Sequence, residues 1–325
     1  MKIIRDYSLI KCKLPIIATP EYFKILAAHD YGYILDGKFV LPYYIKKKSF
    51  FTYMFFTTGV LSNDFISKCD EEFFLTSMIH FVKSERIADF ILMNHVTALF
   101  KYSPVGSKSC NFGSYVIDLS LSENILFNNL HTKHRNVIKK AMKDGISIFH
   151  GMEYKDVCIQ LIQDTMLRQG ITPPSADYYS RIGDSLKKYC DYWIALDING
   201  NPQGSAILVW SEGAFAYYLF GGSCKNPHTG AINLLQWEAI LKMKERGVLK
   251  YDFVGARISP EAGSKYEGIQ RFKSRFGGEL IQGYLWKMPL NNIKYNLYVF
   301  MVSIRNILRG RRIKDIIDQE CEKNG

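Results

Sequence analysis

The segment TGAINLLQWEAILKMKERGVLKYDFVG, residues 229–255, decides the class of fold because it joins a helix to a strand. Apolar side chains recur in it at the spacing of one helical face, for example at Leu235, Ile240 and Met243. Gly247 ends the helical pattern, and the apolar run VLKYDFVG that follows is typical of a strand. The segment therefore predicts a helix that packs on a β-sheet.

The same order of elements is expected twice along the chain. Three strands joined by tight turns at Asn199-Gly200 and Glu212-Gly213 come before the helix, at 192–198, 203–210 and 214–221. The first part of the chain shows β structure at 31–56, then a helical pattern at 70–83 and an apolar run at 87–93. We therefore predict an α+β protein with mixed, mostly antiparallel sheets flanked by helices, built as two copies of one fold.

Composition indicates an anionic partner and a reducing compartment. The chain of 325 residues carries a formal net charge of +11, which favours phosphates of a nucleotide, a tRNA, a lipid headgroup or a membrane surface. Its seven cysteines show no C-x-x-C pair, as expected of reduced thiols. Charged residues interrupt the apolar N-terminus, which makes it a poor signal peptide. We expect a cytoplasmic protein and leave association with the membrane face open.

A basic segment follows the strand SYVIDLS at 114–120. Ser120 and Glu123 have the spacing of a capping box, which predicts one helix that continues to Asp144 and stops at Gly145. Its later turns hold the candidate phosphate-binding residues Lys133, Arg135 and Asn136. The alternative is a solvated basic face that complements the helix dipole.

Four segments in order resemble the FemABX-like family of peptidoglycan-bridge aminoacyltransferases. They are FFTTGVLSND at 55–64, YVIDLSLSENILFNNLHTKHRNVIKKAMKDGI at 115–146, the opening segment 229–255, and GIQRFKSRFGG at 268–278. The resemblance implies tandem halves of the GNAT acyltransferase fold. We place an N-terminal half at 1–150, a second half with the signature motifs at 151–290, and an amphipathic basic helix at 291–325. Val254 and Ala256 flank Gly255 where the family often has Tyr-Asp-Phe-Gly-Gly, and the long coiled-coil arm of some members is absent.

Two residues are the candidates for catalysis. The resemblance implies that Lys273, in the Phe-Lys-x-x-Phe-Gly motif, stabilises a carbonyl oxygen or a phosphate. Asp252 follows Tyr251 at an expected strand end, where it could accept the proton of the acceptor amine. The alternatives are a solvated helical lysine and a carboxylate that bonds nearby backbone amides.

Further candidates concern the substrate and the acyl donor. Arg257, Arg275 and Phe272 are placed in the substrate site by their closeness in sequence to the motif. Gly230 and Ala231 stand before a helix, where backbone amides could bind a donor phosphate, although the coenzyme A loop of GNAT enzymes is incomplete here.

The remaining features concern metals and membranes. His131 and His134 stand three residues apart on a helix, but no third ligand is visible, so we expect no metal site. The tail from Asn292 onward is amphipathic and carries a group of cations, Arg305, Arg309, Arg311, Arg312 and Lys314. It could lie on an anionic membrane or pack on its own protein.

The resemblance implies an acyltransferase that forms an amide on an amine of a nucleotide- or lipid-linked cell-envelope precursor, a peptidoglycan peptide or an amino sugar. The expected donor is aminoacyl-tRNA, a co-substrate rather than a tightly bound cofactor. One alternative is an N-acyltransferase that uses acyl-coenzyme A or acyl carrier protein on an amino sugar of a surface polysaccharide. Another is a non-catalytic basic module that binds tRNA or lipid. The tail leaves peripheral contact with the inner membrane face open.

Overall fold

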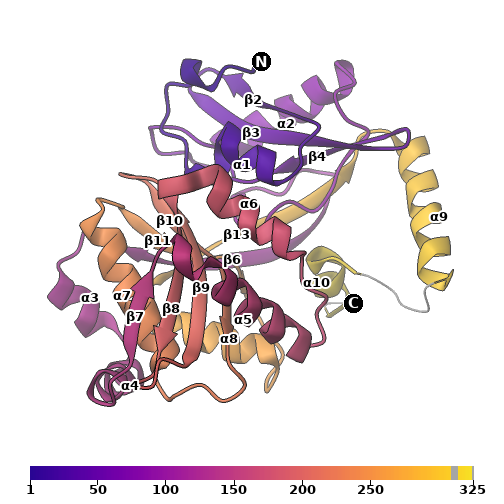
Figure 1. Ribbon diagram of the computed structural model, residues 1–325. Coiled ribbons are helices and arrows are strands. Elements are labelled where there is room, and N and C mark those ends of the chain that lie inside the picture. Colours follow the sequence, from indigo (N-terminus) through magenta and orange to yellow (C-terminus); the bar gives the residue numbers. More distant parts are fainter. Residues whose placement is uncertain (309–313, 324–325) are drawn as a thin grey trace. The chain divides into compact units, whose positions relative to one another are not determined.

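The computed structural model describes residues 1–308 and 314–323 and divides the chain into two compact units (Figure 1). The first unit is Met1–Gly113 with Gln282–Gly325, and the second is Ser114–Ile281. Each unit has its own apolar core, so each is described by itself. The α+β class, with mostly antiparallel mixed sheets flanked by helices, is confirmed.

The first unit is a sheet with helices from both ends of the chain. Its strands are β1 (Lys2–Ile4), β2 (Asp30–Asp36), β3 (Phe39–Lys48), β4 (Phe51–Phe56), β5 (Phe90–Ile91) and part of β13 (Glu279–Pro289). Its helices are α1 (Pro20–Ile25), α2 (Lys68–Ser84), α9 (Asn292–Leu308) and α10 (Ile316–Lys323). The core packs α2 on the sheet through Phe74 and Met78 against Tyr43, Met54 and Trp286.

The second unit holds the segment with which the sequence analysis began. Its strands are β6 (Lys108–Asp118, from Ser114), β7 (Ser147–His150), β8 (Cys190–Leu196), β9 (Pro202–Trp210), β10 (Phe215–Ser223), β11 (Lys250–Asp252) and β12 (Ala256–Arg257). Its helices are α3 (Glu123–Asn129), α4 (Thr132–Lys143), α5 (Lys155–Arg168), α6 (Ala176–Leu186), α7 (Ala231–Glu245) and α8 (Lys265–Ser274).

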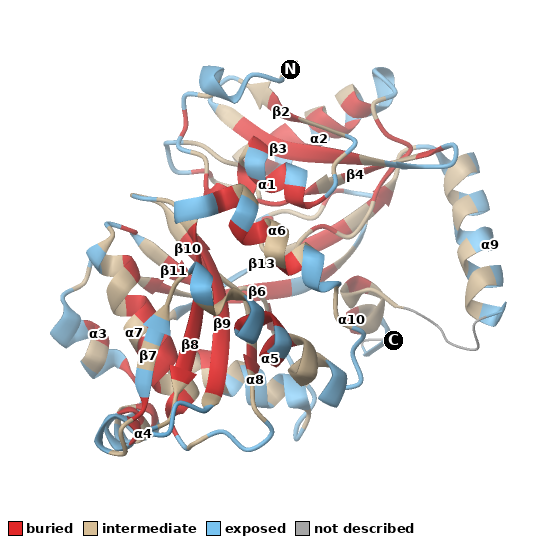
Figure 2. Cartoon of the chain, in the orientation of Figure 1, coloured by how far each residue is buried: buried red, intermediate tan, exposed pale blue. Residues whose placement is uncertain are grey.

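Helix α7 confirms the helix predicted from the opening segment. It is buried on more of its circumference than one face, because Leu234 and Trp237 are buried as well as Leu235 and Ile240. Oε1 of its buried Gln236 accepts a hydrogen bond from the Tyr251 hydroxyl at 2.7 Å, whereas Nε2 of the same side chain is buried without a partner among the described residues. Figure 2 shows β8 and β9 as largely buried strands, whereas β10 is mostly of intermediate burial.

The two units repeat one strand topology. In the first, β2, β3 and β4 form an antiparallel meander, α2 follows, β5 is parallel to β4, and β13 is antiparallel to β5. In the second, β8, β9 and β10 form the meander, α7 follows, β11 is parallel to β10, and β6 is antiparallel to β11. The internal repeat expected from the sequence is therefore present in the strand pairing.

The boundaries between the units differ from the expected boundaries at residues 150 and 290. The last strand of each repeat comes from elsewhere in the chain: β6 precedes the second repeat, and β13 follows it and closes the first. Residues 114–150 therefore belong with the second unit, and the C-terminal helices belong with the first. Pairing between strands that are far apart in the chain produces no local sequence pattern.

The single helix expected over residues 120–144 is wrong. Leu130 has extended backbone angles and separates α3 from α4. The helix-capping oxygen belongs to Ser122, which accepts from the Ile125 amide, whereas the Ser120 hydroxyl bonds to Asp118. His131 caps α4 through Nδ1, which accepts from the Lys133 amide at 3.1 Å. Lys133 and Arg135 therefore lie in the first turn of a helix.

A buried carboxyl in the first unit gives a stability prediction. Glu71 is 3% exposed, and its Oε1 accepts from the Lys101 amide at 2.7 Å. Burial raises the pKa of Glu71 to about 7. Because the folded pKa lies above the unfolded one, the stability from protonated Glu71 is complete below about pH 4.5 and is lost as pH rises through 7.

We therefore expect Glu71→Gln to raise the free energy of unfolding at pH 8 by about 1–3 kcal/mol and to change it little at pH 4.5. The amide oxygen of glutamine can still accept from Lys101. Denaturant unfolding of both proteins at the two pH values measures the difference. An equal effect at both values would mean that the charge of Glu71 is not the cause.

Candidate functional site

The candidate site in the second unit begins at the end of β11. Asp252, the last residue of this strand, is paired with Tyr217 of the parallel β10 and Val116 of the antiparallel β6. Its Oδ1 accepts from the Val254 amide at 2.7 Å and, in a very short contact, from the Ser114 hydroxyl. Asp252 and Ser114 are both buried. The carboxyl group is thus held in one orientation by backbone and side-chain donors.

Lys273 of α8 completes this group. Its ammonium donates to the carbonyl oxygens of Val254 and Gly255, at 2.7 and 2.8 Å, and the side chain is buried. Both accepting residues have positive φ, +52° at Val254 and +79° at Gly255, so the lysine holds a turn that a valine rarely adopts. A solvated lysine, the alternative left open by the sequence, is therefore wrong.

The aromatic residues around Lys273 explain its burial. Phe276 is buried in the core of the unit, with its ring 5.1 Å from that of Phe253, and Phe272 packs against it. These contacts fix the last turn of α8, which places the intervening lysine toward the β11 turn. Phe272 itself is half-buried, and its contact with Phe276 helps to anchor α8.

Burial shifts the pKa values of the two charged groups toward each other. It lowers the pKa of Lys273 to about 8, although the Asp252 carboxylate opposes this. It raises the pKa of Asp252, opposed by the bonds from Ser114 and Val254 and by the charge of Lys273. The difference between the two pKa values is therefore smaller than between a free aspartate and a free lysine. Among the described residues, Lys273 makes no third hydrogen bond, so one N–H remains for a ligand oxygen.

The two predicted arginines near this group have different environments. Arg257 of β12 is buried, with its guanidinium 4.0 Å from the centroid of the Tyr266 ring. Arg275 is half-buried and caps the C-terminus of α8, where its carbonyl accepts from the His131 amide at 2.9 Å. The hydrogen bond from the His131 amide to the Arg275 carbonyl links α8 to the start of α4.

The three predicted phosphate-binding residues on α4 differ in their contacts: Arg135 is bonded within the protein, whereas Lys133 and Asn136 are exposed. Arg135 donates to the carbonyls of Asn128, at 2.8 Å, and Leu130, and to the Thr132 hydroxyl at 3.0 Å. It therefore caps the end of α3 and holds the turn before α4. Lys133 and Asn136 are exposed and remain accessible to a ligand.

The predicted donor loop is occupied by internal contacts. The Ala231 amide donates to the His228 carbonyl at 3.0 Å, so it is not available to a phosphate. Gly230 has a φ of +89°, and a Cβ added there would lie 2.1 Å from the Val137 carbonyl oxygen of α4. Glycine at this position is required for the close approach of α7 and α4.

Gly230→Ala is therefore expected to lower the free energy of unfolding by about 2–4 kcal/mol. Gly200→Ala is the matched control, because Gly200 has a similar φ of +79° but no atom within 4 Å of an added Cβ. The free energy of unfolding of that variant should fall by only about 1 kcal/mol. Denaturant unfolding measures both, and equal losses would show that the contact with Val137 has no cost.

The two histidines considered as metal ligands have structural roles: His131 caps α4, and His134 packs in the core. His134 is buried with its ring 4.7 Å from that of Phe276, and burial lowers its pKa to about 4. Within residues 1–308 and 314–323, no group of three His, Cys, Asp or Glu side chains is arranged to hold a metal ion.

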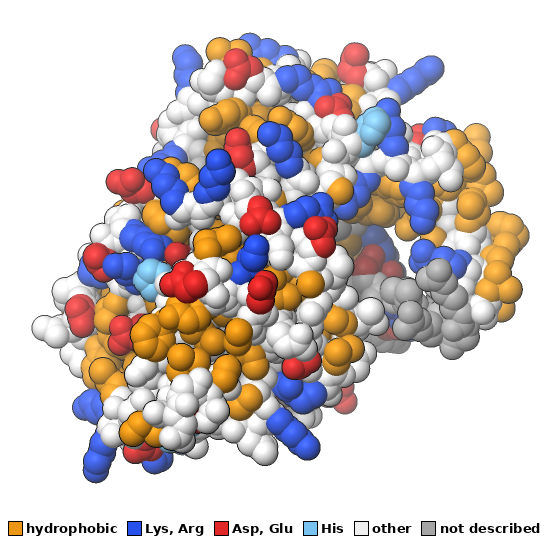
Figure 3. Space-filling model, viewed as in Figure 1, with side chains coloured by type: hydrophobic (Ala, Val, Ile, Leu, Met, Phe, Trp, Pro, Cys, Tyr) orange, Lys and Arg blue, Asp and Glu red, His pale blue; other side chains and the backbone are white. Residues whose placement is uncertain are grey.

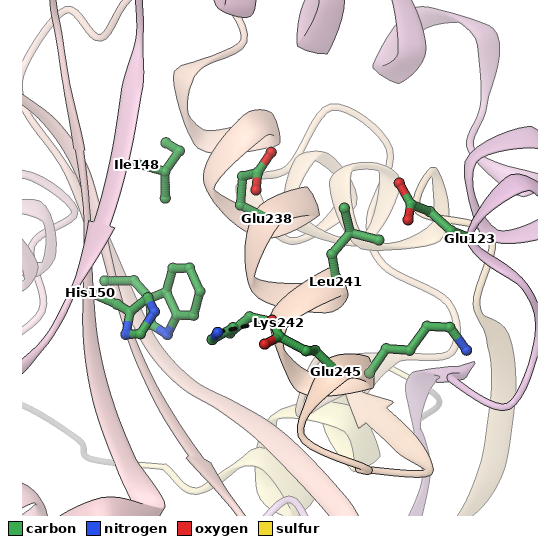
Figure 4. A pocket seen from close by; sticks show the side chains of 9 residues that line it. Glu123, Ile148, His150, Glu238, Leu241, Lys242 and Glu245 are labelled. Atoms are coloured by element: carbon green, nitrogen blue, oxygen red, sulfur yellow. Dashed lines mark hydrogen bonds and ion pairs between the residues drawn. The ribbon is translucent and has the colours of Figure 1, made fainter.

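Sequence reasoning missed Ser114 and a cavity elsewhere in the second unit. Ser114 lies 138 positions from Asp252 in the sequence, so no local motif marks the pair. The cavity, of about 520 Å³, lies between α7 and the strands β7 and β8 (Figure 4). Glu238 and Glu123 line it, and burial together with the charge of Glu123 raises the pKa of Glu238. None of the predicted site residues lines this cavity.

Comparisons with known proteins concern the family and the fold. Residues 199–302, which include Asp252 and Lys273, match the profile of the FemAB family. No curated protein matches the chain. The fold is similar to that of FemX, with a TM-score of 0.70 and 15% identity over 91% of this chain and 99% of that chain.

Two further solved structures share the fold. The C-terminal domain of a putative lysylphosphatidylglycerol synthetase from Agrobacterium fabrum has a TM-score of 0.51 and 14% identity, over 83% of this chain and 87% of that chain. A conserved protein of unknown function from Bacteroides thetaiotaomicron has a TM-score of 0.54 and 10% identity, over 84% and 90%.

Proposed function

The chain is FemABX-like, and from this premise we propose that it transfers an aminoacyl group from aminoacyl-tRNA to an amine of a nucleotide- or lipid-linked cell-envelope precursor. The resemblance stated from the sequence is confirmed, and so is the acyltransferase class at the level of the family. The donor and the acceptor are the parts that we propose here.

The observation that carries the proposal is the buried pair Asp252 and Lys273 at the end of β11. Both lie in the segment that matches the FemAB family. Each has an internal hydrogen-bond network that fixes its position, and each pKa is shifted toward neutrality by burial. Amide formation needs a base for the amine and a cation for the carbonyl oxygen, and these two side chains supply both.

The proposed reaction is a direct transfer. The amine nitrogen attacks the carbonyl carbon of the aminoacyl ester, and the third N–H of Lys273 stabilises the oxyanion. Asp252 accepts the proton that the amine loses as the C–N bond forms. The C–O bond to the tRNA ribose then breaks, and the proton passes from Asp252 to the leaving ribose oxygen. Atoms and charges balance without a covalent enzyme intermediate.

The other predicted site residues are proposed to contact the acceptor and the phosphates of the substrates. We propose that Arg257 and Arg275 contact the acceptor near the pair, with Phe272 beside them, and that Lys133 and Asn136 contact a phosphate farther out. Arg135 supports them by holding the turn between α3 and α4. The occupied Ala231 amide favours aminoacyl-tRNA over a coenzyme A donor bound at the Gly230-Ala231 loop.

The test is a reaction with defined donors and extracted acceptors. Purified protein is incubated with charged tRNA or with acyl-coenzyme A, each with nucleotide-linked or lipid-linked envelope precursors, and products are identified by mass spectrometry. We expect an amide adduct with charged tRNA. An adduct with acyl-coenzyme A alone would replace the proposed donor, and consumption of neither donor would favour the binding-module alternative.

A further inference from the structure

Helix α9 exposes an unusual amount of apolar surface. Its sequence NIKYNLYVFMVSIRNIL contains no acidic residue, and none of its residues is buried. The most exposed apolar side chains are Ile293, Phe300, Ile307 and Leu308, each more than 60% exposed. Figure 3 shows the apolar side chains along this helix, and Figure 2 shows it without buried positions. Exposed apolar surface of this extent indicates a binding face.

The helix nevertheless has a fixed attachment to its own unit. The rings of Tyr295 and Tyr298 pack on Phe90, with centroids 5.7 and 5.0 Å away. Lys294 forms an ion pair with Asp89 at 2.8 Å and donates to the Phe50 carbonyl at 3.2 Å. The N-terminal half of α9 is therefore anchored on β4 and β5, and the exposed face extends beyond this anchor.

A groove runs between α9 and the β3–β4 hairpin of the same unit. Its volume is about 530 Å³, and its walls are mainly apolar, with Phe51, Phe55 and Leu92 on one side and Tyr298, Met301 and Val302 on the other. The groove and the exposed face of α9 share Met301. An apolar groove that continues into an exposed apolar helix face suits a hydrocarbon chain.

Positive charge lines the same groove. Lys46, Lys47 and Lys48 at the hairpin and Arg305 of α9 contribute to its lining, which includes no acidic residue. Within the described parts of the chain, Lys47, Lys48 and Arg305 form no ion pair, and Arg305 Nε is buried without a hydrogen-bond partner. The apolar surface and the cations together match an amphiphile with an anionic headgroup.

We infer that α9 and the β3–β4 hairpin form a docking surface for an anionic phospholipid bilayer. One lipid chain occupies the groove, its phosphate lies among Lys47, Lys48 and Arg305, and the exposed face of α9 enters the interface. No helix in residues 1–308 and 314–323 has the length and apolar character needed to cross a bilayer, so the inferred contact is peripheral. The inference concerns the first unit and does not rest on the transfer reaction proposed for the second.

Of the cations that the sequence analysis placed on the amphipathic tail, Arg305 lines the groove. Arg309, Arg311 and Arg312 lie outside the described residues, and Lys314 forms an ion pair with Glu322. The hairpin lysines Lys46, Lys47 and Lys48, which were not among the predicted membrane contacts, also line the groove.

Sedimentation with vesicles tests the inference on the full chain. We expect binding to vesicles of phosphatidylglycerol and phosphatidylcholine, weaker binding as salt rises, and little binding to phosphatidylcholine alone. Phe300→Asp with Ile304→Asp should reduce partitioning at least about tenfold, and Lys47→Glu with Lys48→Glu should remove the preference for anionic lipid. Phe73→Asp and Lys83→Glu on α2 are matched controls, because both residues are exposed in the same unit. The controls should bind as the wild type does.

A photoactivatable phospholipid with its reactive group in the acyl chain tests the groove. We expect labelling of Phe51, Met301 or Val302, mapped by mass spectrometry, and none in the second unit. Binding that is equal for both vesicle types, or that the Phe300 and Ile304 changes leave intact, would overturn the inference. So would self-association in solution that the same changes abolish, because the apolar face would then bind a second copy.

Discussion

Lys273→Met is expected to reduce amide formation by about 10²–10³-fold. Methionine fills a similar volume but removes the charge that we propose for the oxyanion. It also removes both donors to the Val254 and Gly255 carbonyls, so the turn after β11 loses the bonds that hold its positive φ values. The measurement is the initial rate with a saturating donor, together with the midpoint of thermal unfolding.

Two variants separate the role of Lys273 in catalysis from its role in the turn. Arg271 is an exposed cation on the same helix and forms an ion pair with Glu267 at 2.9 Å. Arg271→Met removes this charge and should leave the rate close to that of the wild type. Lys273→Arg keeps a charge that does not titrate near pH 8, so activity that survives should extend to higher pH. A Lys273→Met protein that folds normally and transfers at the wild-type rate would rule out the catalytic assignment.

Asp252→Asn is expected to lower the rate by about 10²–10⁴-fold and to change the pH profile. In the wild type, the rate should rise as Asp252 loses its proton, at a pH above the ordinary range of an aspartate because burial raises its pKa. It should fall again near pH 8 as Lys273 loses its proton. Asparagine cannot accept the proton, so the rising limb should disappear while the fall near pH 8 shifts to lower pH, because the carboxylate no longer favours the charged lysine.

The control for this change is Asp118→Asn. Asp118 lies on β6, next to β11, and pairs with Lys250 at 2.9 Å, but its pKa is lowered to about 2 by hydrogen bonds from Lys250 and Ser120. That variant should keep both limbs of the profile. If Asp252→Asn keeps the rising limb, another group is the base, and Asp252 only positions the turn through Val254 and Ser114.

Much of the fold was predictable because its signals are local. The spacing of Leu235, Ile240 and Met243 predicted α7, and the turns at Asn199-Gly200 and Glu212-Gly213 predicted the meander, since period and turn chemistry act within a few residues. The division of the helix at Leu130 was missed because an extended leucine has no sequence signal of its own. The unit boundaries were missed because strand pairing joins residues far apart in the chain.

The candidate site shows the same limit. Lys273 and Asp252 were named from their motifs, but the motifs do not state what surrounds each side chain. The Ser114 hydroxyl, the two carbonyls that accept from Lys273, and the use of Arg135 and Ala231 in internal contacts all depend on segments that meet only in the fold.

The sequence by itself determined much of the order of helices and strands, the repeat of that order, and the residue types available for acyl transfer, because each follows from short-range patterns of side chains; the division at Leu130 is an exception. Only the tertiary structure decided that Lys273 is buried against a strained turn, that β6 and β13 complete repeats to which they are not adjacent in sequence, and that the hairpin lysines line the groove beside α9. The physical reason is that burial, pKa shifts and strand pairing depend on neighbours in space, and long-range contacts set those neighbours.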